Sequence, residues 1–145
     1  MAYEQLKLEN QLCFPLYAAS RLITREYQPH LDALGITYPQ YLVLLVLWEK
    51  DGQLVTDISK KLLLHTNTIT PLLQRMEKQQ LIVRQRSKTD ECQVIIFLSK
   101  NGQKMKDKAT SIPEELAKKL VEHQLDVNDL MRLKESVDML VKVLR

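Results

Sequence analysis

Hydrophobic positions recur at helical spacing through most of this chain. The stretch from Leu6 to about Leu31 predicts one long helix, and Pro15 should either bend it or mark its true start. Gly35 should close this helix. The apolar and aromatic positions that define it are Leu12, Leu16, Ile23 and Tyr27.

A second helix is predicted from residue 37 to Trp48. Residues 37–40 read Thr-Tyr-Pro-Gln, which has the Thr-x-x-Gln form of a capping box and therefore marks a helix start. The residues that follow are apolar on nearly every side, so this helix should be buried in the core.

The next segment has the pattern of a helix-turn-helix. After a turn at Asp51 and Gly52, residues 56–63 predict a short helix, and a tight turn at residues 64–65 leads to another helix through about Gln79. Thr66 or Asn67 should cap that last helix. Its inward stripe is formed by Ile69, Leu72, Leu73 and Met76, and its opposite face carries Thr68, Gln74, Arg75 and Lys78. Such hydrogen-bonding and cationic groups suit base edges and phosphates.

A β-hairpin should follow the helix-turn-helix. Residues 81–85 and 93–98 are rich in β-branched and aromatic residues, and the polar stretch 86–91 between them is typical of a turn. Arg84 and Arg86 alternate to the same side of the first strand and would give the hairpin a cationic edge. The expected fold is therefore mainly α with a small hairpin wing, a winged helix-turn-helix.

The C-terminal third predicts two more helices. Ser99 should cap a helix that runs past Met105 until Pro113 interrupts it, and a last helix should follow Asp126. The last helix has an a/d seam at Leu130, Leu133, Val137, Leu140 and Leu144. This seam favours burial against a second copy of the chain, with packing inside one chain as the alternative. Dimerisation would double the contacts of one recognition helix across two DNA half-sites.

Length and charge refine this picture. At 145 residues the chain is predicted to be a single domain over 1–145, with a DNA-binding lobe at about 37–100 and dimerisation helices at about 4–33 and 100–145. The net charge of +3 hides an asymmetry, since residues 60–106 hold ten Lys and Arg against three Asp and Glu. A basic centre between acidic ends favours contact with phosphates, although a basic solvated surface without a partner gives the same pattern.

Composition excludes several classes of protein. The start of the chain does not resemble a signal peptide, and the longest apolar run, residues 42–48, is too short for a membrane span, which predicts a cytosolic protein without a membrane partner. Cys13 and Cys92 cannot form a disulfide framework, and neither a metal site nor a cofactor is implied. No role is assigned to the histidines, His30, His65 and His123.

The predicted order of elements resembles the MarR family of bacterial regulators over essentially the whole chain. The resemblance is sharpest to the branch of the organic hydroperoxide resistance regulators. It is carried by residues 8–14 (LENQLCF) with 16–18 (LYA), 35–41 (GITYPQY) and 68–73 (TITPLL).

This resemblance implies a redox sensor. By position, Cys13 would be the peroxide-sensing cysteine, and Tyr17, Tyr27 and Tyr38 would be the tyrosines whose hydroxyls hold its thiolate. A thiolate attacks the O–O bond of a peroxide, and the resulting sulfenic acid can be trapped by a second thiol. Some members of the branch carry that second thiol in the C-terminal helices. This chain has none there, so an organic hydroperoxide and a low-molecular-weight thiol would be the effectors.

The chain departs from the family at the wing tip. There the family usually has Asp-x-Arg, with the arginine entering the minor groove, whereas residues 90–92 read Asp-Glu-Cys. Arg84, Arg86 or Lys88 would then have to supply the minor-groove cation. Cys92 is either a neutral strand residue or a second redox thiol.

The leading hypothesis is a homodimeric transcriptional repressor that binds a near-palindromic double-stranded operator and releases it when Cys13 is oxidised. Three alternatives remain: a MarR-like repressor released by a small aromatic ligand, a thiol peroxidase, and an interaction module that has lost DNA binding. An enzyme is not expected, because no histidine or arginine is placed to activate a catalytic thiol. The predicted DNA contacts are Thr66, Asn67, Thr68, Thr70, Gln74, Arg75, Lys78, Arg84, Arg86 and Lys88.

Overall fold

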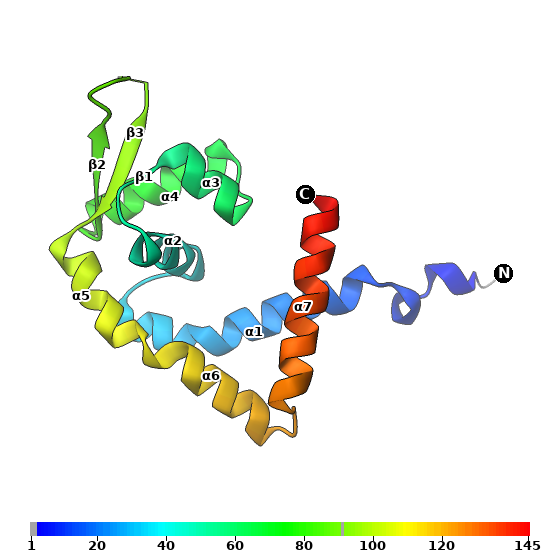
Figure 1. Cartoon of the computed structure of the whole chain (residues 1–145). Helices are drawn as coiled ribbons and strands as arrows, with labels where there is room; N and C mark the ends of the chain where they lie inside the picture. The colour runs from blue at the N-terminus through cyan, green and yellow to red at the C-terminus, as the bar shows by residue number, and fades with distance from the viewer. Residues whose placement is uncertain (1–2, 91) are drawn as a thin grey trace. The chain divides into compact units, whose positions relative to one another are not determined.

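Helices and a small antiparallel sheet make up residues 3–90 and 92–145, the part of the chain that the computed structural model describes (Figure 1). Residue 91, at the wing tip, lies outside the described residues. The mainly α fold with a hairpin wing confirms the predicted fold class. The chain divides into two compact units, residues 1–109 and residues 110–145.

The first predicted helix is shorter than expected at its start. Two 3₁₀ turns, η1 (Glu4–Leu6) and η2 (Leu8–Asn10), precede α1 (Cys13–Leu34). The early start was wrong because polar side chains close the turns: the Asn10 amide donates to the carbonyl of Glu4, and the Gln11 amide to those of Gln5 and Lys7. Pro15 lies in the first turn of α1, where its missing N–H costs nothing. Gly35 caps the other end in the left-handed region, at φ 70°.

Helix α2 (Tyr38–Glu49) is the centre of the first unit. The predicted capping box is present, because the Thr37 side chain accepts from the backbone of Gln40 and the Gln40 side chain accepts from the backbone of Thr37. The helix contacts α1 and also α3, α4, α5 and β3. Val43, Leu44 and Leu47 are essentially inaccessible to solvent, which confirms the expected burial. The burial of each such side chain contributes about 1.5–3 kcal/mol to the free energy of unfolding.

The helix-turn-helix consists of α3 (Val55–Leu62) and α4 (Thr66–Lys78). Leu63 joins them in a left-handed conformation, at φ 55°. The predicted cap of α4 was wrong by one residue: His65 is the N-cap, without a side-chain hydrogen bond, while Thr66 and Asn67 lie inside the helix. The inward stripe is confirmed, since all four of its members are buried: Ile69, Leu72, Leu73 and Met76.

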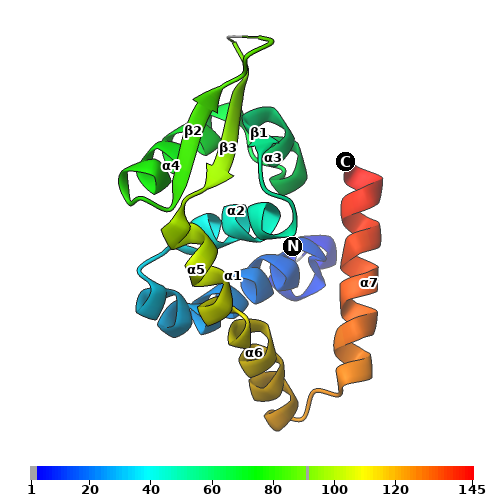
Figure 2. The same cartoon turned by 60° about the vertical axis from the view of Figure 1, so that its left-hand side comes forward.

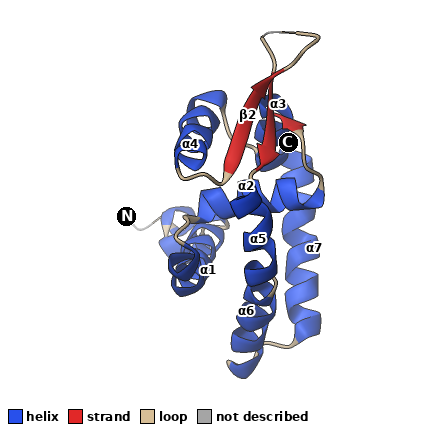
Figure 3. Ribbon diagram, turned by 90° about the vertical axis from the view of Figure 1, so that its left-hand side faces the viewer, coloured by secondary structure: helices blue, strands red, loops and turns tan. Residues whose placement is uncertain are grey.

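The sheet has the strand order β1-β3-β2 and is antiparallel. Strands β2 (Ile82–Arg86) and β3 (Val94–Leu98) form the predicted hairpin, which projects beyond α3 and α4 (Figures 1 and 2). Strand β1 (Gln53–Leu54) was not predicted, because two residues give no alternation to detect. Figure 3 shows α4 beside β2, with which it is in contact. The wing is therefore anchored to the helix that precedes it.

Ser99 directly precedes helix α5 (Lys100–Ala109) as its predicted cap, and its Oγ accepts from the N–H of Gly102 at 3.0 Å. The backbone packs tightly here, because a Cβ at Gly102 would lie 2.3 Å from the carbonyl oxygen of Leu81. The Trp48 indole donates to the Gly102 carbonyl at 2.9 Å, so the start of α5 is fixed to α2. The expected run to Pro113 was wrong: α5 ends at Ala109, and Pro113 lies in the first turn of the next helix.

The second unit contains α6 (Ser111–Glu122) and α7 (Val127–Leu144). Asp126 caps α7 as predicted, by accepting from the N–H of Asn128. No residue of α7 is buried, although its seam is apolar, and Leu133 and Leu144 are 53% and 76% exposed. Within the described residues no helix by itself has the length and hydropathy of a membrane span; only α1 and α2 taken together, bent by 75°, meet that criterion.

Candidate functional site

Three tyrosines cluster where α1 meets the start of α2. The ring of Tyr27, on α1, lies 5.3 Å from that of Tyr38 and 5.8 Å from that of Tyr41, measured between centroids. Tyr38 and Tyr41 are 6.2 Å apart, one turn of α2 from each other, and Trp48 extends the group beyond Tyr41. Sequence reasoning named Tyr27 and Tyr38 but missed Tyr41, whose i+3 spacing from Tyr38 was the available signal.

The tyrosine cluster, Tyr27, Tyr38 and Tyr41, keeps its phenols protonated at neutral pH. Burial raises the pKa of all three hydroxyls above 10.0, and neighbouring phenols raise those of Tyr27 and Tyr41 further. The cluster therefore gathers three neutral O–H groups, from α1 and the first turn of α2, in one place.

Cys13 is the first residue of α1, exposed and unpaired. Tyr27 lies fourteen residues further along the same helix, only about 40° around its circumference, but roughly 21 Å along its axis. Cys13 and the tyrosine cluster thus share one face of α1 without reaching each other within one chain.

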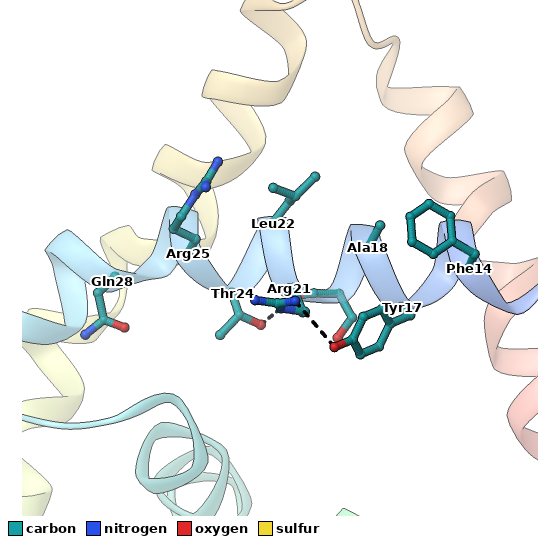
Figure 4. A pocket seen from close by; sticks show the side chains of 9 residues that line it. Phe14, Tyr17, Ala18, Arg21, Leu22, Thr24, Arg25 and Gln28 are labelled. Atoms are coloured by element: carbon teal, nitrogen blue, oxygen red, sulfur yellow. Dashed lines mark hydrogen bonds between the residues drawn. The ribbon is translucent and has the colours of Figure 1, made fainter. Parts of the chain in front are cut away.

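Tyr17 lies apart from the cluster. Its hydroxyl accepts from the Arg21 guanidinium at 3.4 Å, and that guanidinium lies 5.5 Å from the centre of its ring. Both residues belong to an open groove of about 680 Å³ along α1 (Figure 4). The groove is lined by Phe14, Tyr17, Ala18, Ser20, Arg21, Leu22, Thr24, Arg25 and Gln28.

The outward face of α4 carries most of the predicted DNA contacts. Thr70 is half-buried, whereas the other six are exposed: Thr66, Asn67, Thr68, Gln74, Arg75 and Lys78. The buried stripe of the same helix fixes this orientation, because the two sets lie on opposite sides of its axis. The result is a polar and cationic surface on a rigid helix.

The cations of the wing differ in their exposure to solvent. Arg86 and Lys88 are exposed near the hairpin tip, whereas Arg84 shares a strand face with buried Ile82 and is itself half-buried. The Nε of Arg84 is buried without a hydrogen-bond partner among the described residues. The strand alternation was predicted correctly, but the shared face is buried at Ile82 and becomes exposed only toward the hairpin tip, so Arg86 and Lys88 are more accessible than Arg84.

Cys92 is exposed and unpaired at the wing tip, where its N–H donates to Oδ1 of Asp90 at 3.0 Å. The Asp-Glu-Cys motif cannot be described completely, because residue 91 lies outside the described residues. In the residues that are described, no cluster of three His, Cys, Asp or Glu side chains could hold a metal ion.

Comparison with known proteins identifies the family. Residues 25–109 match the profile of the transcriptional regulators SarA/Rot. The organic hydroperoxide resistance transcriptional regulator of Bacillus subtilis (strain 168) is 52% identical over 111 residues, which are 77% of this chain and 76% of that protein.

Solved structures agree with this assignment. Reduced AbfR bound to DNA, from Staphylococcus epidermidis, is 37% identical with a TM-score of 0.77, covering 97% of this chain and 96% of that one. Disulfide-formed AbfR is 38% identical with a TM-score of 0.63, covering 97% and 92%. The predicted family is confirmed: this chain belongs to the MarR-type transcriptional regulators, in the branch of the organic hydroperoxide resistance regulators, and is not an enzyme.

Proposed function

We propose that the protein is a homodimeric repressor that leaves its operator when an organic hydroperoxide oxidises Cys13. The observation that carries the proposal is the separation on α1: Cys13 and the tyrosine cluster share a face but lie roughly 21 Å apart. A thiolate sensor and its phenol donors therefore come together only between two copies of the chain.

Two α1 helices packed antiparallel satisfy this requirement. A two-fold axis near Ser20, midway between Cys13 and Tyr27, brings each cysteine to the partner's Tyr27 and Tyr38. Ser20 lies on the same face as Cys13 and Tyr27, is exposed, and is small enough for a close helix approach there. The predicted dimerisation helices, 4–33 and 100–145, carry exposed apolar side chains that a partner would cover: Leu12, Phe14, Leu22, Met131, Leu133, Val143 and Leu144.

The chemistry of release follows from the thiolate. The sulfur of Cys13 attacks the O–O bond of ROOH, the alkoxide leaves and takes a proton as ROH, and the cysteine becomes a sulfenic acid. A low-molecular-weight thiol then forms a mixed disulfide and releases water. The thiol group added to Cys13 would lie against the tyrosine cluster of the other copy, two members of which belong to α2. Because α2 contacts α3 and α4, displacement of the cluster changes the position of the recognition helix.

DNA binding is supported by the surface of α4 and the wing. Base readout is assigned to the exposed polar face of α4, from Thr66 to Arg75, and phosphate contacts to Lys78, Arg86 and Lys88. The half-buried Arg84 supports the wing rather than entering the minor groove. AbfR, a relative with the same fold, is described as DNA-bound in its reduced state, which agrees with this assignment.

A second candidate is a repressor released by a small aromatic acid. The groove along α1 favours it, because its lining residues include two aromatic side chains and two guanidinium groups: Phe14, Tyr17, Arg21 and Arg25. Such a ligand would act without Cys13. The two candidates are therefore separated by the behaviour of a cysteine variant.

The test is binding to a fluorescent DNA fragment from upstream of the protein's own gene, before and after cumene hydroperoxide and free cysteine are added. We expect wild type and Cys92→Ser to release the DNA on oxidation and Cys13→Ser to retain it. If Cys13→Ser releases DNA equally, the cysteine sensor is refuted. If no variant responds to the peroxide but salicylate releases all of them, the aromatic-ligand candidate replaces it.

A further inference from the structure

Gln40 is a buried polar residue that links two helices. Its side chain is only 3% exposed. Its Oε1 accepts from the N–H of Thr37 at 3.1 Å, which completes the capping box of α2. Its Nε2 donates to Oε1 of Gln79 at 2.7 Å, across thirty-nine residues of sequence. One side chain therefore joins the first turn of α2 to the end of the recognition helix α4.

A hydrophobic residue would pack at this position without the cost of burying an amide. Apolar contacts between α2 and α4 are non-directional and tolerate small shifts, whereas a hydrogen bond fixes the relative position of its two partners. The link thus adds a directional constraint that the apolar core lacks.

The α2 end of the link lies in the same helical turn as two tyrosines of the cluster. Tyr38 and Tyr41 flank Gln40 in the first turn of α2, and both rings pack on Tyr27. A displacement of these rings that shifts the first turn of α2 would also shift the Gln40 side chain, which extends from the same turn.

The α4 end of the link is equally rigid. Gln79 is the C-cap of α4, and its N–H donates to the carbonyl of Arg75 at 2.9 Å. Gln80 follows in the left-handed region, at φ 62°, and the Leu81 N–H returns to the Met76 carbonyl at 3.0 Å. Because this end is closed by backbone hydrogen bonds, a force on the Gln79 side chain moves α4 as a body rather than unwinding it.

We propose that the Gln40–Gln79 hydrogen bond transmits the state of the tyrosine cluster to the recognition helix. Gln40 acts here as a positioning residue, since it touches neither DNA nor oxidant. The inference rests on the proposed function, because it presupposes that oxidation of Cys13 disturbs the cluster.

The experiment measures the ratio of DNA dissociation constants after and before treatment with cumene hydroperoxide and free cysteine, using the full-length protein. Gln79→Met removes the acceptor but keeps the length of the side chain. Gln79→Glu keeps an acceptor and serves as the conservative variant. Thr37→Ala removes the hydroxyl that caps α2 but leaves the link intact, so it controls for general weakening of that turn. Thermal unfolding confirms that each variant is folded.

We expect Gln79→Met to reduce the peroxide-induced ratio by roughly two- to tenfold, the factor that one neutral hydrogen bond supplies. Gln79→Glu and Thr37→Ala should retain the wild-type ratio. If Gln79→Met responds like wild type, or if Thr37→Ala loses as much as Gln79→Met, the link is not the transmitter, although the redox repressor stands. If wild type itself shows no ratio above one, the proposed function fails first and the inference fails with it.

Discussion

The ring of Tyr27 packs on the ring of Tyr38 with 5.3 Å between their centroids, which places two protonated phenols from different helices side by side. This pairing joins α1 to the first turn of α2. The same two residues supply the hydrogen-bond donors of the proposed sensor. Their hydroxyls can therefore be removed without emptying the cluster, because phenylalanine retains the ring.

Loss of one phenol donor should slow the oxidation of Cys13. We expect Tyr38→Phe to lower its rate of reaction with cumene hydroperoxide at pH 7 by roughly ten- to a hundredfold, since a hydrogen bond to a charged group contributes about 1.5–3 kcal/mol. The rate is measured as loss of free thiol in a Cys92→Ser background. Tyr17→Phe is the matched control, because the Tyr17 hydroxyl is engaged by Arg21. Equal effects of the two variants would remove Tyr38 from the sensor.

Much of this fold could be predicted because its signals are local. The capping box at Thr37, the left-handed Gly35 and the apolar stripe of α4 are short patterns with one dominant structural reading. Errors arose where a local signal had two outcomes: a proline starts a helix as readily as it stops one, and Pro113 does the former.

The sensor and the link between helices were less accessible to prediction. The resemblance to the family pointed to Cys13 and to two of the three clustered tyrosines. The distance along α1 between the cysteine and the cluster, however, follows only once the helix is known to be continuous from Cys13 to Leu34. The contact of Gln40 with Gln79 depends on how two helices pack, and no periodicity encodes it. The same holds for the close approach of Gly102 to Leu81.

The tyrosine cluster should make stability fall at alkaline pH. Burial, and for two members the neighbouring phenols, raise the pKa of Tyr27, Tyr38 and Tyr41 above 10.0. Because the unfolded chain loses these protons first, the contribution to the free energy of unfolding is complete below pH 10 and is lost as the pH rises through the folded-state values. Urea unfolding from pH 8 to 11 should show this decline. Tyr41→Phe should flatten it, and an unchanged slope would contradict the assignment.

Gly102 should tolerate no side chain. A Cβ there meets the Leu81 carbonyl oxygen at 2.3 Å, so Gly102→Ala must shift α5 or the start of β2 and should cost about 3 kcal/mol in urea unfolding. Gly35→Ala is the comparison, because nothing lies within 4 Å of its added Cβ and only the strain of φ 70° remains, about 1–2 kcal/mol. A smaller loss at Gly102 than at Gly35 would show that α5 yields easily.

Substitutions of two cations on α4 should affect DNA binding in different ways. Lys78→Ala, assigned to a phosphate, should weaken binding to operator and unrelated DNA alike and reduce the salt dependence by about one counterion per protomer, or about two per dimer. Arg75→Ala should weaken operator binding more than non-specific binding, by about 1–3 kcal/mol, because it is assigned to a base. Lys134→Ala is the control, since Lys134 is paired with Asp138 on α7. Salt titrations of fluorescence anisotropy separate these outcomes.

The antiparallel arrangement of α1 helices makes a prediction about one position. If a two-fold axis passes near Ser20, the two Ser20 residues of a dimer face each other, and a cysteine there should form a disulfide between copies under mild oxidation. The variant carries Cys13→Ser and Cys92→Ser, so that Ser20→Cys is its single thiol. Non-reducing electrophoresis should show a rapid conversion to covalent dimer.

Arg25→Cys in the same background is the matched control. Position 25 is exposed on the same helix but lies five residues from the axis, so its two copies would be separated by roughly 15 Å along α1, well beyond the reach of a disulfide. Cross-linking at Ser20 but not at Arg25 would require the antiparallel crossing, and with it a sensor shared between protomers. Cross-linking at neither, in a protein that sediments as a dimer, would place the crossing elsewhere and separate Cys13 from the partner's Tyr27.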